Sequence, residues 1–283
     1  MKIILTIAGF AALTACQTTT NAASVNLSPA TATAGAAMTG TVTASANNGD
    51  AVTITIDGST IAGVTRDTNL DRGAFRAFTR IDATASQPLP TNLMELGHSG
   101  DTADGAMSAS IASSSGWSPN GFKQAATYAR NGSTSMPTSG TATLSGKYVG
   151  SWGSADSGQE DIYGVTGDTT LTADFGASTI AGTITGRKMI RYDGTEPKDY
   201  ADVTLGAASI SADGTYAGTA TGGIWDNGAG DTVTDVSGSW AGMIGGATGN
   251  QAAGVVRLDK MYNVFTAGGV TPTHVETGVF LAE

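Results

Sequence analysis

The chain contains few of the residues that catalytic and metal-binding sites most often use. Its 283 residues include one cysteine and two histidines, His98 and His274. A single cysteine excludes an intramolecular disulfide, and two histidines far apart in the sequence do not make a histidine-rich zinc site. Neither histidine lies in a recognisable motif for nucleophilic catalysis. We therefore predict a protein that is not an enzyme and that uses no cofactor.

Two further metal-binding hypotheses fit the sequence poorly. A single histidine could be an axial haem ligand, but no apolar slot for a porphyrin accompanies His98 or His274. We expect both to be turn or surface residues. Residues 67–73 place oxygen ligands at alternate positions as calcium loops do, but the glycine falls one place late and Phe78 occupies the position of the closing glutamate. A polar turn is the expected structure of this segment.

Charged and aromatic residues are also scarce, at 13% and 6% of the chain. Acidic residues outnumber basic ones by 24 to 14, which gives a net charge of -10. This balance disfavours nucleic acid as a partner and provides no attraction to an anionic membrane surface. The chain is instead rich in threonine, serine and glycine, with 40 glycines. Because glycine and threonine are poor helix formers, the composition predicts short strands joined by tight turns.

The longest apolar segment lies near the start of the chain and is too short to cross a bilayer as a helix. Lys2 precedes it, residues 3–13 form it, and small residues lead to Cys16. This arrangement is typical of a secretory signal, and the cysteine is then incidental. It also resembles a bacterial lipoprotein signal, which implies cleavage before Cys16 and lipidation of that residue, with palmitate among its acyl chains. Gln17, in place of an aspartate, implies sorting to the outer membrane.

Composition along the chain predicts four segments. Residues 51–56 alternate apolar side chains with threonine before an Asp-Gly turn, which indicates a strand and a turn. Residues 97–116 are rich in glycine, serine and aspartate and receive no assignment. Proline and glycine cluster at 135–140, which indicates a domain boundary. The segments are a signal peptide at 1–15, a flexible tether at 16–24, an N-terminal β-rich domain at 25–136 and a barrel domain at 137–283.

The barrel domain follows from eight successive strand patterns. They lie near 141–152, 163–175, 179–187, 201–211, 215–224, 233–243, 252–258 and 274–282. An even number of sequential antiparallel strands can close into an up-and-down barrel, which removes the exposed edges of the sheet. The predicted fold class is therefore all-β, with an eight-stranded antiparallel barrel after a smaller β-rich domain.

A Gly-x-aromatic-x-Gly motif occurs three times in these strands, centred on Tyr148, Tyr216 and Trp240. A strand has a period of two residues, so each ring and its flanking glycines share one face. A large ring beside two positions without side chains suits the interior of a small barrel. We expect the three rings to point inward and to fill an interior that is just wide enough for side chains.

The order of these motifs resembles the barrel domains of transferrin-binding protein B and its relatives, from residue 140 to residue 283. The motifs are Gly146-x-Tyr148-x-Gly150, residues 173–177 leading into Ile180-x-Gly182-x-Ile184, Gly214-x-Tyr216-x-Gly218, Gly238-x-Trp240-x-Gly242 followed by residues 252–256, and residues 278–280. Those relatives include factor H-binding protein and haem or haemoglobin accessory lipoproteins of Gram-negative bacteria. The resemblance implies a surface-exposed binding lipoprotein and leaves its ligand open.

The connections of an up-and-down barrel alternate between its two ends, and here the longer ones fall at one end. These connections hold aromatic and basic residues of the types enriched in interface cores. The first strand enters the barrel, and the last strand leaves it, at the opposite end. We therefore expect the N-terminal part to lie apart from the long connections. Alternatively, the side chains fold inward and plug the barrel. The candidate ligand-binding residues are Arg187, Lys188, Arg191, Tyr192, Trp225, Tyr262 and Phe265.

Together these features suggest a lipid-anchored outer-membrane protein that faces the exterior and binds a protein or an iron- or haem-carrying ligand through these connections. A structural or envelope-shielding lipoprotein without a soluble ligand is the alternative. A membrane-embedded pore is disfavoured, because the threonine, serine and alanine of the strand faces offer no lipid-facing apolar band.

The anchor can be tested by substitution at Cys16. Cys16→Ser should leave an unprocessed or soluble periplasmic protein, because an acidic, moderately polar chain has no reason to stay on a membrane without acyl chains. The measurement is partition between detergent and aqueous phases, with electrophoretic size as the marker of processing. A mutant that stays in the detergent phase at normal size would contradict the lipoprotein hypothesis.

Overall fold

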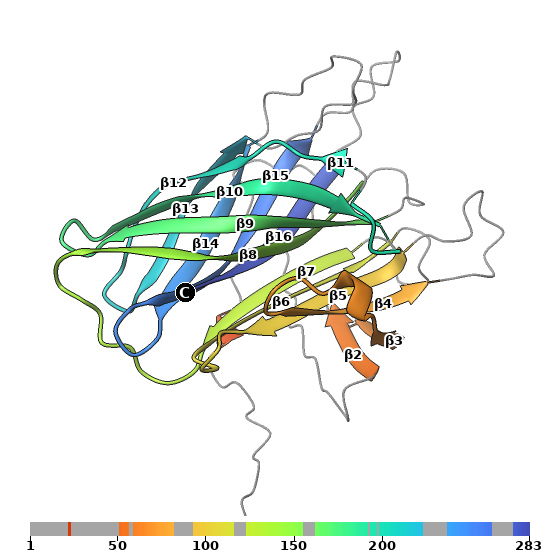
Figure 1. Cartoon of the computed structure of the whole chain (residues 1–283), viewed down its shortest axis with the longest axis horizontal. Coiled ribbons are helices and arrows are strands. Elements are labelled where there is room, and N and C mark those ends of the chain that lie inside the picture. The colour runs from red at the N-terminus through yellow and green to blue at the C-terminus, as the bar shows by residue number, and fades with distance from the viewer. Residues whose placement is uncertain are drawn as a thin grey trace, which may run out of the picture.

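The structure is a computed structural model, and it consists almost entirely of β-strands arranged in two sheets (Figure 1). It describes residues 22–23, 51–56, 59–81, 93–115, 123–154, 162–191, 193–196, 198–222, 237–261 and 274–283. Within these ranges no helix has both the length and the apolar character that a membrane-crossing helix needs.

The C-terminal sheet is a closed barrel of eight antiparallel strands, as predicted. Each strand pairs with the next one of the barrel, and the last pairs with the first along Gly146–Ser154 of β8. A short additional strand, β11 (Lys198–Asp199), pairs only with β10. The barrel strands are β8 (Thr141–Ser154), β9 (Tyr163–Asp174), β10 (Thr179–Ile190), β12 (Val203–Ser209), β13 (Thr215–Gly222), β14 (Ser237–Gly245), β15 (Gln251–Met261) and β16 (His274–Ala282).

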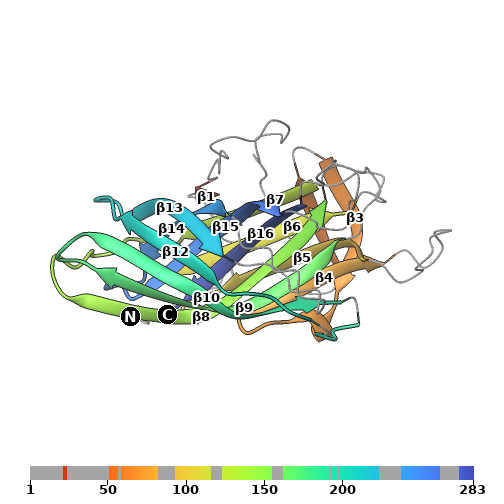
Figure 2. The same cartoon turned by 90° about the horizontal axis from the view of Figure 1, so that it is seen from above.

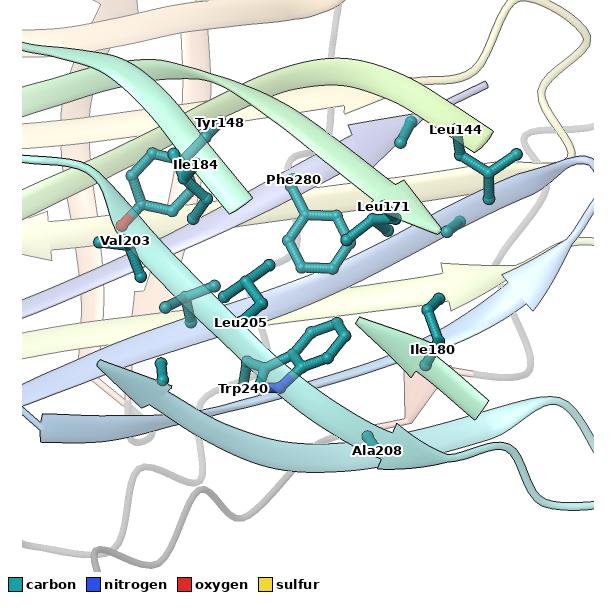
Figure 3. Close-up of a cluster of buried hydrophobic side chains, with 14 of the residues drawn as sticks. Leu144, Tyr148, Leu171, Ile180, Ile184, Val203, Leu205, Ala208, Trp240 and Phe280 are labelled. Atoms are coloured by element: carbon teal, nitrogen blue, oxygen red, sulfur yellow. The ribbon is translucent and has the colours of Figure 1, made fainter. Parts of the chain in front are cut away.

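The three motif rings point into the barrel, which confirms the predicted strand faces. Tyr148, Tyr216 and Trp240 are buried in one apolar cluster, and Figure 3 shows Trp240 and Phe280 in the enclosed space. The Tyr216 and Trp240 ring centroids lie 5.0 Å apart. Two of the motif glycines are required by these rings, because a Cβ at Gly218 would overlap Trp240 and a Cβ at Gly242 would overlap the Tyr216 ring of the neighbouring strand. The interior is thus filled by side chains.

The N-terminal sheet has seven strands in the order β1-β7-β6-β5-β4-β3-β2. The predicted strand at 51–56 is confirmed as β2. The unassigned region 97–116 falls largely within a hairpin, β5 and β6, whose alternation was hidden by glycine and serine on both faces. The elements are β1 (Ala22–Ala23), β2 (Ala51–Ile56), β3 (Ser59–Arg66), the 3₁₀ turn η1 (Thr68–Leu70), β4 (Phe75–Ile81), β5 (Leu93–Asp101), β6 (Met107–Ser114) and β7 (Lys123–Arg130).

This sheet packs against the outside of the barrel, with β6 and β7 beside β15 and β16 (Figure 2). The contact is an apolar cluster in which Phe75, Ile111 and Tyr128 of the sheet meet outward residues such as Val255 and Val279 of the barrel. The predicted boundary near 136 falls between β7 and β8. That residues 138–283 alone fold into a closed barrel stays a prediction. Such a fragment would expose the apolar face that the sheet covers.

A polar contact continues the interface toward the end of the barrel where β8 ends and β16 begins. Gln124 of β7 donates from Nε2 to the Ser151 carbonyl oxygen at 2.9 Å, and its Oε1 accepts from Thr277 Oγ1 at 3.0 Å. All three side chains are buried. Buried amides and hydroxyls are costly unless they are hydrogen-bonded, so this contact specifies how the sheet aligns along the barrel.

The filled interior can be tested by removing one ring. Trp240→Ala should lower the free energy of unfolding by about 3–5 kcal/mol, because a fully buried ring leaves a cavity. Thr204→Ala, on the exposed wall of β12, should cost under about 1 kcal/mol. The measurement is urea denaturation of the whole chain. Similar small losses for both variants would contradict the inward orientation of the ring.

Candidate functional site

The topology gathers the long connections of the barrel at one end, which we call the long-loop end. Residues 155–162, 191–202, 223–236 and 262–273 link strands there, whereas 175–178, 210–214 and 246–250 make the turns at the opposite, short-turn end. Because side chains fill the barrel, a ligand has to be met by the ends or the outer surface of the molecule.

A buried ion pair lies inside the barrel near the long-loop end. Nη2 of Arg187 donates to Oε1 and Oε2 of Glu276 at 2.6 and 2.5 Å. Tyr148 donates its hydroxyl to Glu276 Oε1 at 2.8 Å, and Nη1 of Arg187 donates to the Ala201 carbonyl oxygen at 2.6 Å. Arg187 is 1% exposed and Glu276 is 0% exposed. The two charges therefore compensate each other out of contact with water.

A β-bulge in β10 directs Arg187 inward. Thr185 is opposite Asp168 of β9, but Lys188 is opposite Thr166, so β10 holds one extra residue. Gly186 in this bulge has φ +57°, a conformation that glycine adopts without strain. The bulge reverses the alternation, and Arg187 takes an inward position. We expect from the sequence that Arg187 lies in a long connection and presents its charge to a partner. This is wrong, because Arg187 lies in β10 and points into the barrel.

The electrostatics of this cluster keep Arg187 charged and keep Tyr148 and Tyr200 neutral. Burial alone would lower the pKa of Arg187, but the Glu276 carboxylate outweighs it and raises the pKa above its ordinary value. Burial, followed by the charge of Glu276, raises the pKa values of Tyr148 and Tyr200. The Arg187 guanidinium also lies 5.6 Å from the Tyr200 ring centroid. A guanidinium that stays charged beside phenols that stay neutral is typical of a structural ion pair.

The connection after β10 is held against the N-terminal sheet. Arg72 donates from Nε to Glu196 Oε1 at 3.1 Å, and Lys188 Nζ lies 3.6 Å from Glu196 Oε2. Leu70 of η1 and Ile190 of β10 share a buried cluster. The expectation that the N-terminal part lies apart from the long connections is therefore wrong, because the sheet runs lengthwise along the barrel wall and reaches this end.

Two of the predicted binding residues are exposed at this end. Arg191 is exposed, and the Lys188 side chain is 44% exposed. Tyr200 is buried in the interior cluster of the barrel, as the alternative of a plugged barrel predicted, whereas Ile190 is buried on the outside of the barrel against the N-terminal sheet. A binding role for Lys188 and Arg191 stays a prediction. The predicted residues that lie outside the described ranges are Cys16, Tyr192, Trp225, Tyr262 and Phe265.

The residues considered as metal ligands make structural contacts instead. His98 is buried in β5, not at the surface as expected, and its Nε2 lies 3.2 Å from the Leu70 carbonyl oxygen. Burial lowers the pKa of His98 to about 4, so its ring is neutral near pH 7. In the predicted polar turn, Asp71 pairs with Arg66 and Asp67 accepts from the Asn69 amide. Within the described residues no three His, Cys, Asp or Glu side chains form a group that could hold a metal ion.

Sequence reasoning missed Glu276, although a signal for it was present. Glu276 precedes Gly278 and Phe280 at the inward spacing of two residues, and a carboxylate at an inward position needs a buried partner. The partner was harder to identify, because Arg187 is inward only through the bulge. The contact of Arg72 with Glu196 had no local signal, since it joins residues far apart in the chain.

The fold and the site thus define a filled eight-stranded barrel with a covering sheet and one end rich in long connections. Comparison with solved structures finds members of the family that the sequence motifs resemble. Transferrin-binding protein B from Haemophilus parasuis, as a double mutant, is 15% identical, with a TM-score of 0.39 over 84% of this chain and 42% of that protein. The haemoglobin receptor HpuA from Kingella denitrificans is 13% identical, with a TM-score of 0.33 over 84% of this chain and 89% of the receptor.

A second transferrin-binding structure, intact Ap-TbpB with both lobes, is 15% identical, with a TM-score of 0.41 over 84% of this chain and 43% of that protein. The chain therefore spans less than half the length of these transferrin-binding proteins. No protein-family model and no curated protein matches the chain. At these identities the likeness is one of fold alone.

The ion pair can be tested by neutralising one partner. Glu276→Gln should cost about 3–5 kcal/mol of unfolding free energy, because it leaves the Arg187 charge buried without its counter-ion. The double variant Arg187→Met, Glu276→Leu should recover most of this loss, since it removes both charges. Urea denaturation measures both effects. If the double variant is as unstable as the single one, the loss comes from packing and not from the unpaired charge.

Proposed function

We propose that the protein is a lipid-anchored outer-membrane lipoprotein that binds a macromolecular ligand, an iron- or haem-carrying protein in the first instance, through its long-loop end. The observation that carries this proposal is the asymmetry of a filled barrel. Its interior holds side chains such as Trp240 and Phe280, so it offers no internal binding site, while its long connections all fall at one end. That end is the part of the barrel with the most freedom to vary for recognition.

The start of the chain supports the anchor. An apolar region followed by small residues and Cys16 resembles a lipoprotein signal, and Gln17 after it implies the outer membrane. Several acyl chains on one residue make membrane attachment effectively permanent. An otherwise acidic chain needs such an attachment, because its net charge of -10 gives no attraction to anionic lipid.

The exposed cations at the long-loop end support a role in recognition. Lys188 and Arg191 are two of 14 basic residues in the chain, and Tyr192 follows directly. Basic side chains in an acidic protein steer an acidic partner to the place where they lie. Trp225, Tyr262 and Phe265 belong to neighbouring connections and supply residue types that dominate interface energetics. These residues are the proposed contact set.

A structural or envelope lipoprotein without a soluble ligand is the second candidate. It is favoured by the ion pairs of Glu196 with Arg72 and Lys188, which use two of the cations at the long-loop end within the molecule. It also fits the part of the exposed barrel wall where Thr170, Thr204 and Thr221 present hydroxyl groups.

Binding can be tested with the proteins for which the similar structures are named. The Cys16→Ser chain, immobilised, is exposed to iron-loaded transferrin and to haemoglobin, and binding is followed by surface plasmon resonance. Alanine at Arg191, Trp225 or Tyr262 should weaken binding of the recognised protein, by about 30-fold at any true hot spot.

The matched control is Lys147→Ala, which removes an exposed cation from the barrel wall, where it pairs with Asp168. This variant should bind normally. If it weakens binding as much as Arg191→Ala, the effect is one of net charge and the proposed contact set is wrong. If neither protein binds and deletion of the gene alters envelope permeability instead, the structural candidate replaces the binding one.

A further inference from the structure

The N-terminal sheet ends, on one side, with a strand that lies close to the anchor in sequence. β1 pairs with β7 in antiparallel register, with Ala22 opposite Ala129 and Ala23 opposite Tyr128. The segment from Cys16 to Ala22 is short, because an extended chain advances at most about 3.6 Å per residue and this segment therefore reaches about 22 Å. An acyl group on Cys16 has to lie within that distance of β1.

The end of β7 beside β1 lies at the short-turn end of the barrel. Arg130 follows Ala129 and donates from Nη1 to the carbonyl oxygens of Asp213 and Ile244, at 2.9 and 3.0 Å. Asp213 lies in the turn between β12 and β13, and Ile244 lies at the end of β14. Ala22 is therefore next to the short-turn end. Figure 2 shows β1 beside β7.

The direction of β1 strengthens this placement. Because the pairing is antiparallel, β1 starts opposite Ala129 of β7 and ends opposite Tyr128. It therefore runs away from Arg130. The N-terminal end of β1 is thus the end that faces the short-turn end. The long-loop end is distant, since β9 has 12 residues and a tilted strand of that length extends about 30 Å along a barrel axis.

From this geometry we propose that the short-turn end is the face apposed to the membrane surface, and that the long-loop end points away from it. This inference rests on the proposed lipid anchor and adds an orientation to it. The partner of the short-turn end is the lipid headgroup layer to which the acyl chains bring it. A barrel held in this way presents its long connections outward without any further contact.

The charges of the short-turn end indicate apposition without insertion. Among the described residues, the exposed acidic residues at this end include Asp101, Asp104, Asp213 and Glu283. Asp104 is neighboured by Gln251, whose Nε2 donates to Oδ1 at 3.0 Å, and the Arg130 guanidinium is already bonded to carbonyl oxygens. Carboxylates stay in water, and anionic headgroups repel them. Attachment therefore comes from the acyl chains, while the protein surface remains outside the headgroups.

The orientation can be measured with two matched cysteine variants of the full lipidated chain. The variants are Ala212→Cys and Ala201→Cys. Ala212 lies in a turn at the short-turn end, Ala201 lies in a connection at the long-loop end, and both are exposed. The Cys16 sulfur is occupied in the lipidated protein, so each variant has one free thiol for a fluorescent donor. The labelled proteins are bound to phosphatidylcholine vesicles that carry a headgroup-linked acceptor. Donor emission should fall strongly at position 212 and little at position 201.

Three outcomes separate the orientation from the anchor. An equal loss of emission at both positions, or a larger loss at 201, overturns the orientation while vesicle binding upholds the anchor. A chain that does not bind vesicles overturns both. Insertion of 20 glycine and serine residues after Gln17 should abolish the difference between the positions, because a flexible insert of that length has a mean reach of about 25 Å. A difference that persists would mean that the tether does not set the orientation.

Discussion

The structure depends on the closure of eight strands around an interior that large rings fill. Closure leaves no free edge, and the two-residue period of a strand then assigns every side chain to the inside or the outside. The inward positions of Tyr148, Trp240 and Phe280 leave Val149, Ala241 and Val279 on the outer wall. One wall of the barrel is therefore apolar, and the N-terminal sheet covers it.

The same closure limits where the protein can act. A filled interior admits no ligand, and the Arg187–Glu276 pair occupies the inside near the long-loop end with hydrogen bonds from Tyr148 and to the Ala201 carbonyl. The covering sheet occupies one wall, and its turn around η1 contacts the end of β10 and the connection that follows. What remains accessible is the exposed wall and the two ends, and the ends differ in the length of their connections. This difference gives the molecule a polarity that a symmetrical barrel lacks.

Much of the fold could be predicted because its signals are local. The eight barrel strands, the inward faces of Tyr148, Tyr216 and Trp240, and the strand at 51–56 follow from alternation and turn residues within a few positions of each other. The hairpin of β5 and β6 could not be assigned, because serine, glycine and alanine carry little contrast between its faces. Within the candidate site, Arg191 is exposed and the Lys188 side chain is 44% exposed, while their binding role stays a prediction. Arg187 is not exposed, since one extra residue in β10 reverses its orientation.

The sequence by itself determined the strand pattern, the motif rings and the order of the barrel strands, because each depends on spacing along the chain. Only the tertiary structure decided what the strands meet across space. It placed Arg187 against Glu276, buried His98 beneath Leu70 and brought the Arg72 turn to Glu196. These contacts join residues that are distant in the chain, and their energy depends on burial that no local pattern records. Alternation says which side of a strand a residue takes, but only the packing of sheet on barrel says whether that side is covered.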